Sequence, residues 1–135
     1  MKTLILTLIL TLLSANFSQT EAQTNQQFKL RVNNQKIIGG GKLKIKFLSV
    51  VEDSRCPEGV NCIQAGTAKI QISVSKGRGA AKTFEINTDL QPNIVSFEGY
   101  DIKFTDLVPR PKDNIRIDRN GYTATFVVSK SGNSK

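Results

Sequence analysis

Residues 68–74 of the chain read AKIQISV, with an apolar residue at every second position and polar residues between them. A period of two is typical of a β-strand that turns one face to the core and the other to water. The same alternation returns in five further segments: 28–32, 43–47, 84–86, 100–104 and 122–128. After residue 22 no apolar stripe with helical spacing persists over three turns, so the sequence predicts an all-β domain.

Turn-forming residues separate these segments. They are residues 39–41 (GGG), 76–79 (KGRG), 91–93 (QPN) and 109–111 (PRP). The pair 47–48 (FL) followed by 50–51 (VV) breaks strict alternation, and we expect a β-bulge near Ser49. Short strands with Gly and Pro at such intervals predict one antiparallel two-sheet sandwich, immunoglobulin-like in general layout, with seven or eight short strands. A partly closed barrel is the alternative.

The dipeptide Asn120-Gly121 gives the sharpest turn prediction. It is typical of a type I′ hairpin turn, in which both central residues need a positive φ. Such a turn places Ile117 opposite Ala124 and Ile115 opposite Phe126. All four side chains then share one face, so the expected register is self-consistent.

Residues 1–22 have the features of a secretory signal peptide. Lys2 gives a positive start, residues 4–13 (LILTLILTLL) form an apolar run, and Thr20 and Ala22 suit a cleavage site after residue 22. A membrane-spanning helix needs roughly 20 apolar residues, about twice this run, so we expect cleavage and no membrane span. The sequence thus predicts a secreted or periplasmic protein. Its expected parts are the signal peptide over 1–22, a flexible lead over 23–27, a single sandwich domain over 28–130 and a flexible tail over 131–135.

The composition argues against catalysis. The chain has 135 residues, of which 19 are Lys or Arg and 11 are Asp or Glu, and it contains no His. Histidine is the usual general base near neutral pH and the commonest metal ligand, so its absence removes Ser-His-Asp chemistry and most metal sites. The glycines at 39–41 lack the strand-loop-helix context of a phosphate loop. We therefore expect no catalytic residues, no metal and no cofactor.

Cys56 and Cys62 are the two cysteines of the chain, with five residues between them. In an oxidising compartment an isolated pair of this kind favours a disulfide; free or redox-active thiols and a metal site are the alternatives. A loop pinned at a strand end could serve for binding, because scaffolds commonly present sites on loops. The candidate binding-loop residues are Asp53, Ser54, Arg55, Pro57, Glu58 and Gly59. A purely structural loop is the other interpretation, since Asp53 and Arg55 flank Ser54 closely enough for local charge-assisted hydrogen bonds.

Basic residues dominate the segment 29–46, which contains no acidic residue. Five of them fall on positions that point away from the core: Lys29, Arg31, Lys42, Lys44 and Lys46. If the two strands that carry them are neighbours, they form a basic face that could bind nucleic acid, lipopolysaccharide or acidic glycan. The alternative is that these lysines keep the sheet soluble and its edges unpaired.

Residues 51–66, VEDSRCPEGVNCIQAG, resemble the hallmark of a functionally uncharacterised family of small exported bacterial proteins. The family pattern is Glu-Asp-Ser-Arg-Cys-Pro, two residues, a Val-like position, a polar residue and Cys, with Gly shortly after. Gln64 stands where members often have Trp. A strand like residues 68–74 and a later segment like residues 100–111 follow, so the resemblance covers most of the domain. It implies export and this architecture, and it implies no activity.

These features together predict an exported, non-catalytic binding or structural module of the bacterial envelope or exterior, present as a monomer. Two alternatives name a partner: an anionic polymer bound to the basic face, or another envelope protein recognised by the disulfide loop, as in an inhibitor or adhesion-type protein. Binding of a polymer by several lysines weakens steeply as salt rises, whereas recognition through the loop depends on the Cys56–Cys62 segment.

Overall fold

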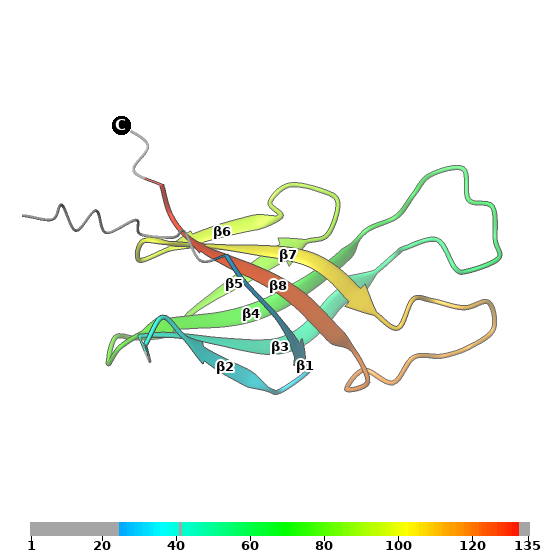
Figure 1. The fold of residues 1–135 in the computed structure, drawn as a ribbon. Helices are drawn as coiled ribbons and strands as arrows, with labels where there is room; N and C mark the ends of the chain where they lie inside the picture. Colours follow the sequence, from blue (N-terminus) through cyan, green and yellow to red (C-terminus); the bar gives the residue numbers. More distant parts are fainter. Residues whose placement is uncertain (1–24, 41, 133–135) are drawn as a thin grey trace, which may run out of the picture.

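A computed structural model describes residues 25–40 and 42–132, so the expected signal peptide lies outside the described residues. The described part is all β, as predicted, and contains eight strands (Figure 1). They are β1 (Gln26–Arg31), β2 (Gln35–Ile38), β3 (Leu43–Asp53), β4 (Ala68–Lys76), β5 (Lys82–Asn87), β6 (Ile94–Phe97), β7 (Tyr100–Val108) and β8 (Thr123–Lys130). β1 begins two residues before the alternation that predicted it. Within these residues there is no helix with the length and apolar character needed to cross a membrane.

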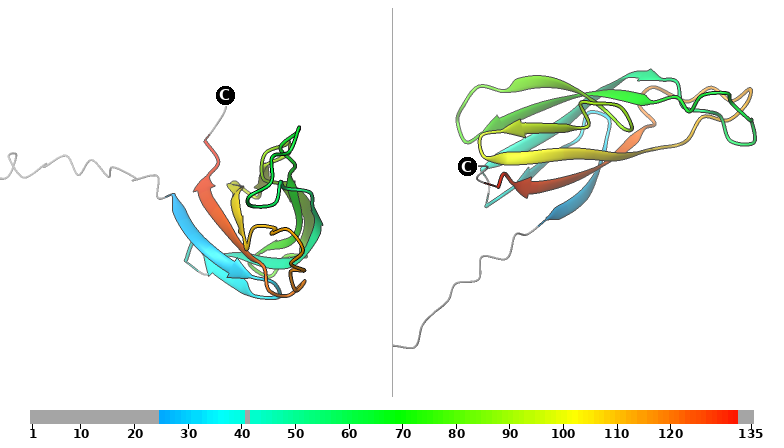
Figure 2. Two further views of the ribbon diagram at one scale, coloured as in Figure 1. Left: turned by 90° about the vertical axis from the view of Figure 1, so that its right-hand side faces the viewer. Right: turned by 90° about the horizontal axis from the view of Figure 1, so that it is seen from above.

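The strands form two antiparallel sheets of four, in the orders β1-β8-β7-β6 and β2-β3-β4-β5. Figure 2 shows the sheets as two facing layers, which confirms the two-sheet sandwich. Neighbours within each sheet are consecutive along the chain except β1 and β8. The connections therefore form a meander, closed by the β1–β8 pairing, rather than the Greek-key connections of an immunoglobulin domain.

The apolar residues of the alternating segments fill the space between the layers. Leu43, Ile45 and Phe47 of β3 are fully buried, as are Phe104 of β7 and Phe126 of β8. The rings of Phe47 and Phe126 meet edge-to-face with their centroids 6.4 Å apart, which joins the two sheets. Each such side chain stabilises the fold by about 2 kcal/mol through burial, so the alternation in sequence is also the source of the core.

β3 is bent by two register shifts, between Phe47 and Ser49 and between Val50 and Glu52. The bulge expected near Ser49 is confirmed, and a second irregularity follows it. An extra residue in one strand increases the local bend and twist and re-aims the side chains beyond it. The two shifts lie directly before Asp53, which ends β3 and opens the loop that carries both cysteines.

The hairpin expected at Asn120-Gly121 is wrong. Ala124 and Phe126 of β8 pair with Leu107 and Phe104 of β7. The expected pairing of Ala124 and Phe126 with Ile117 and Ile115 therefore does not form. Leu107 is fully buried. It fills the core better than a partner from the more polar segment 112–119 would. That segment stays outside both sheets. Residues 118–121 instead form a turn in which the Gly121 N–H donates to the Asp118 carbonyl over 2.9 Å.

The type I′ geometry occurs between β6 and β7. Glu98 and Gly99 have φ values of 47° and 83°, and Phe97 pairs with Tyr100 across this two-residue connection. Both central residues therefore have the positive φ that the turn requires. Sequence reasoning missed this turn because a glutamate is a poor predictor of positive φ, although Gly99 supplies half of the usual signal.

Candidate functional site

The loop between β3 and β4, residues 54–67, carries the motif singled out in the sequence. Cys56 and Cys62 form a disulfide with an S–S distance of 2.17 Å and a Cα–Cα distance of 5.9 Å. Between them, the Val60 N–H donates to the Pro57 carbonyl over 3.2 Å, and Gly59 has a φ of 79°. The predicted disulfide is confirmed, and the segment it closes is a tight turn rather than an extended strand.

Arg55 is the best-anchored side chain of this motif. Its Nε lies 2.7 Å from Asp53 Oδ1 and its Nη2 lies 2.8 Å from Asp53 Oδ2, which is a two-pronged ion pair. Nη2 also donates to the Pro109 carbonyl over 2.9 Å, and Nη1 donates to the Leu107 carbonyl. The Arg55 and Asp53 side chains are only 7% and 8% exposed. The guanidinium thus ties the start of the β3–β4 loop to the end of β7.

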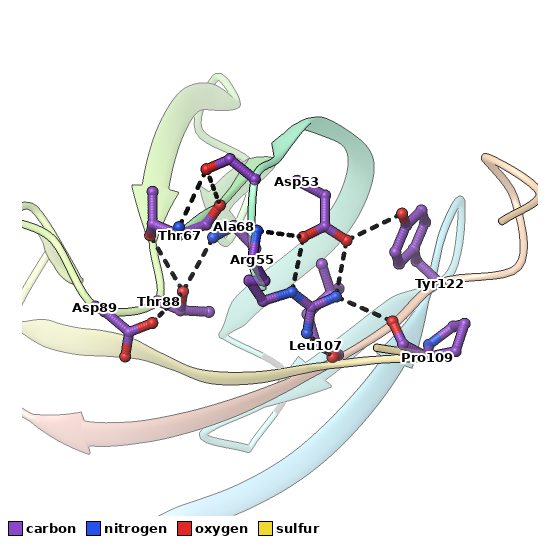
Figure 3. Close-up of polar contacts among 10 residues, drawn as sticks. Asp53, Arg55, Thr67, Ala68, Thr88, Asp89, Leu107, Pro109 and Tyr122 are labelled. Atoms are coloured by element: carbon purple, nitrogen blue, oxygen red, sulfur yellow. Dashed lines mark hydrogen bonds and ion pairs between the residues drawn. The ribbon is translucent and has the colours of Figure 1, made fainter. Parts of the chain in front are cut away.

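Tyr122 completes this group, which we call the Arg55 cluster: Asp53, Arg55, Tyr122 and the carbonyls of Leu107 and Pro109. The Tyr122 hydroxyl donates to Asp53 Oδ2 over 3.1 Å, so the carboxylate lies between Arg55 and Tyr122 (Figure 3). Burial by itself raises the pKa of Asp53, but the hydrogen bonds and charge of Arg55, together with Tyr122, outweigh it and hold that pKa below its usual value. Burial and the nearby Asp53 charge raise the pKa of Tyr122.

A second set of contacts closes the base of the β3–β4 loop. The Ser54 N–H donates to the Thr67 carbonyl over 2.9 Å, and the Ser54 hydroxyl both donates to that carbonyl and accepts from the Thr67 N–H. A Cβ on Gly66 would lie 1.6 Å from the Ser54 carbonyl oxygen. Only glycine allows the two arms of the loop to approach so closely.

The β7–β8 loop, residues 109–122, lies beside the β3–β4 loop at the same end of the sandwich, as both Figures 1 and 2 show. The Glu58 N–H donates to the Pro111 carbonyl over 2.9 Å. The Glu58 carboxylate lies 3.8 Å from Lys112 Nζ, and both side chains are more than half exposed. We call these two loops together the loop end of the molecule.

The candidate binding-loop residues therefore fall into two groups. Asp53, Ser54 and Arg55 are engaged with each other or with the main chain and hold the loop in place. Pro57, Glu58 and Gly59 lie on the turn enclosed by the disulfide, where Glu58 and Gly59 are exposed. The contacts of the Asp-Ser-Arg segment are those of a structural anchor, and what the loop presents to solvent lies further along it.

Sequence reasoning missed the apolar side chains that the loop end exposes. Val60, Ile63 and Ile115 are 41%, 104% and 62% exposed. A large aliphatic side chain at a loop tip gains nothing from the fold and is a candidate contact for a partner. The available signal was two aliphatic residues within the short polar segment 58–64, one of them directly after Cys62.

Four of the five residues of the expected basic face are divided between the sheets, and Lys42 lies in the connection directly before β3. Lys29 and Arg31 lie on β1, which pairs with β8; Lys44 and Lys46 lie on β3, which pairs with β2 and β4. The condition for a single basic face, that these two strands are neighbours, is not met. Just after β1, where the chain turns into β2, two hydrogen bonds reach β3: the Asn33 N–H donates to the Phe47 carbonyl over 2.8 Å, and the Phe47 N–H donates to the Asn34 carbonyl over 3.0 Å. Their outward side chains therefore leave from different faces.

The loop end contains several hollows. One of about 170 Å³ lies beneath the disulfide and is lined mainly by polar residues of the β3–β4 loop, β5–β6 connection and β7. A second, of about 370 Å³, lies in the β7–β8 loop, and residues 116–120 of the same loop line a third, of about 460 Å³. Arg110 borders the first two. Among the described residues there is no group of three His, Cys, Asp or Glu side chains placed to hold a metal ion.

Comparison of the chain with protein-family models, with characterised proteins and with solved structures finds no match. The fold and the site by themselves define the class of this protein. It is a two-sheet β-sandwich in which a buried arginine fixes the disulfide loop to a neighbouring loop.

Proposed function

We propose that the protein is an exported, non-catalytic binding module that presents its loop end to another protein of the envelope or exterior. The observation that carries this proposal is the contrast within the β3–β4 loop. The Arg55 cluster fixes the base of the loop through a buried ion pair, while Ile63 at its tip is fully exposed. A loop held in one conformation loses little conformational entropy on binding, which favours recognition.

Export rests on two supports. The segment 4–13 has the length of the apolar core of a signal peptide. The Cys56–Cys62 disulfide is typical of a protein that matures in an oxidising compartment.

The loop end also favours protein recognition over polymer binding by the strands. The basic strand residues divide between two faces, so a polymer chain lying on one face would meet only part of them. At the loop end, by contrast, aliphatic and cationic side chains lie together, and a mixed surface of this kind is typical of protein interfaces.

Photo-crosslinking in the native exporting cell tests the proposal. A photoreactive amino acid replaces Ile63 in one variant and Thr83 in a control, where Thr83 is an exposed residue of β5 away from the loop end. We expect a discrete protein adduct from position 63 and none from position 83. Adducts of equal yield from both positions, or none from either, would contradict loop-end recognition and favour a purely structural module.

A further inference from the structure

One hollow of the loop end, which we call the β7–β8 cavity, has a volume of about 370 Å³. Its lining includes Pro109, Ile115 and Ile117, and three cationic residues, Arg110, Lys112 and Arg116. Ile117 packs against the hydrophobic core from this loop, so the floor of the cavity is fixed to the fold. Ile115 is 62% exposed and forms an accessible apolar wall.

The cations around the cavity are mostly free for a ligand. Within the described residues, neither Arg110 nor Arg116 forms an ion pair, and Lys112 reaches only the exposed carboxylate of Glu58 at 3.8 Å. Asp118 is the one acidic residue of the lining, and its Oδ1 accepts the Asn120 N–H over 3.0 Å. The cavity thus combines apolar walls with an excess of positive charge, in a chain of net charge +8.

We propose that the β7–β8 cavity receives an acidic segment of the partner protein, with one aliphatic side chain of that segment inside the cavity and flanking carboxylates on Arg110 and Arg116. This inference rests on the proposed function and names the chemistry of its partner. Guanidinium groups bind carboxylates through paired hydrogen bonds, and an apolar pocket beside them gives a place for the anchoring side chain.

A protein segment fits this site better than other anionic ligands do. No aromatic side chain lines the cavity, so nucleic-acid bases would have no surface on which to stack. A lipid surface would contact protruding tips, whereas Ile117 lies in the floor of a hollow. A short peptide can place one side chain in a hollow and its neighbours on the rim.

The test measures binding of a fluorescein-labelled peptide, Gly-Ser-Glu-Leu-Glu-Glu-Leu-Glu-Gly-Ser, to the purified protein by fluorescence anisotropy at low salt. Two matched peptides replace either both Leu by Ser or all Glu by Gln. The protein variants are Arg110→Gln/Arg116→Gln, the apolar-wall variant Ile115→Ser, and a control, Lys42→Gln/Lys44→Gln. The two double variants remove the same charge, but the control removes it from the β2–β3 connection and β3.

We expect the Glu–Leu peptide to bind and Arg110→Gln/Arg116→Gln to weaken it by about tenfold or more. The control should change the dissociation constant by less than about twofold, because its charges lie elsewhere and are screened. Ile115→Ser and the Leu-to-Ser peptide should each weaken binding by about fivefold to tenfold, since each removes one side of the apolar contact. All variants should keep the thermal unfolding midpoint within a few degrees, because the changed residues are exposed.

Three results would overturn the inference: no binding of the Glu–Leu peptide up to about 1 mM, an equal loss in both double variants, or equal binding of the peptide with Leu replaced by Ser. Binding of vesicles that contain phosphatidylserine, with the same dependence on Arg110 and Arg116 and without peptide binding, would replace the protein partner by a membrane. Crosslinking from position 63 without peptide binding would refute this inference and leave the proposed function standing. If neither crosslinking nor peptide binding is observed, the inference and the proposed function are both refuted.

Discussion

The Arg55 guanidinium makes four hydrogen bonds, two to Asp53 and one each to the carbonyls of Leu107 and Pro109. A lysine has the same charge but lacks the planar fork that reaches these acceptors together. Because both charged groups are buried, neither can be removed without leaving the other uncompensated, which costs several kcal/mol. The Arg in the motif is therefore explained by its structural task.

Asp53→Asn tests the charge of this cluster. The lowered pKa of Asp53 in the folded state means that the carboxylate stabilises the fold above the unfolded pKa of about 3.9. That contribution is lost as the pH falls through the folded value. We expect Asp53→Asn to lose about 3 kcal/mol at pH 7 in urea unfolding, and the difference from the wild type to shrink below about pH 4. Asp101, whose pKa is lowered by hydrogen bonds from Ser131 and Ser96, titrates in both proteins and cancels in the comparison.

A difference between the two proteins that stays constant from pH 7 to pH 2.5 would contradict the charge argument. It would mean that the amide disturbs the cluster by its shape alone.

Gly66→Ala tests the close approach at the base of the β3–β4 loop. The added methyl would lie 1.6 Å from the Ser54 carbonyl oxygen, so the two arms must separate and give up their hydrogen bonds. We expect a loss of about 3 kcal/mol or more in the free energy of unfolding. Gly132→Ala is the matched control, since a Cβ there meets nothing within 4 Å, and it should change stability by less than about 0.5 kcal/mol. Equal effects of the two substitutions would refute the steric explanation.

At the scale of the element, hydrophobic alternation predicted most strands and the bulge near Ser49, because the period of side-chain burial is a local property. The hydrogen bonds between Asp53 and Arg55 are also local, and the spacing of two residues had indicated that they were possible. Local spacing could not place Tyr122 on Asp53, which is 69 residues away. The hairpin at Asn120-Gly121 failed for the same reason: a turn propensity is local, whereas the competition for Ala124 and Phe126 is decided by β7.

Removal of the disulfide tests how the β3–β4 loop is held. Cys56→Ser/Cys62→Ser should lower the free energy of unfolding by about 2 kcal/mol, as expected for a short closed loop. The Arg55 cluster and the hydrogen bonds of Ser54 remain, so the loosening should stay local. Hydrogen exchange should therefore rise for residues 57–65 and stay unchanged for the central parts of β3 and β4. Faster exchange throughout both strands would show instead that the disulfide supports the whole sheet.

For the whole molecule, the decisive contact is the pairing of β1 with β8, the first and last described strands. It closes the meander and places β1 in the sheet opposite β3. Alternation predicts which face of each strand is buried, but it carries no information on which strand lies beside which, because every inward face is similarly apolar. The basic residues face outward as predicted, but the condition for one shared basic face, that their strands are neighbours, is not met.

This division of charge leads to a prediction for binding to heparin, used as a general polyanion. Three variants each remove two positive charges: Lys29→Gln/Arg31→Gln on β1, Lys42→Gln/Lys44→Gln at the start of β3, and Arg110→Gln/Arg116→Gln at the loop end. A polyanion releases counterions only where it touches the protein, so retention depends on the local number of cations and not on the net charge.

The loop segment 110–119 carries Arg110, Lys112, Arg116 and Arg119 within ten residues, and only Lys112 pairs with an acid among the described residues. We therefore expect the loop-end variant to elute from heparin at the lowest salt, and the two strand variants to show smaller and similar shifts. If Lys42→Gln/Lys44→Gln gave the largest shift, the polyanion would lie on the outer face of β3, and the loop end would not be the main cationic surface of the molecule.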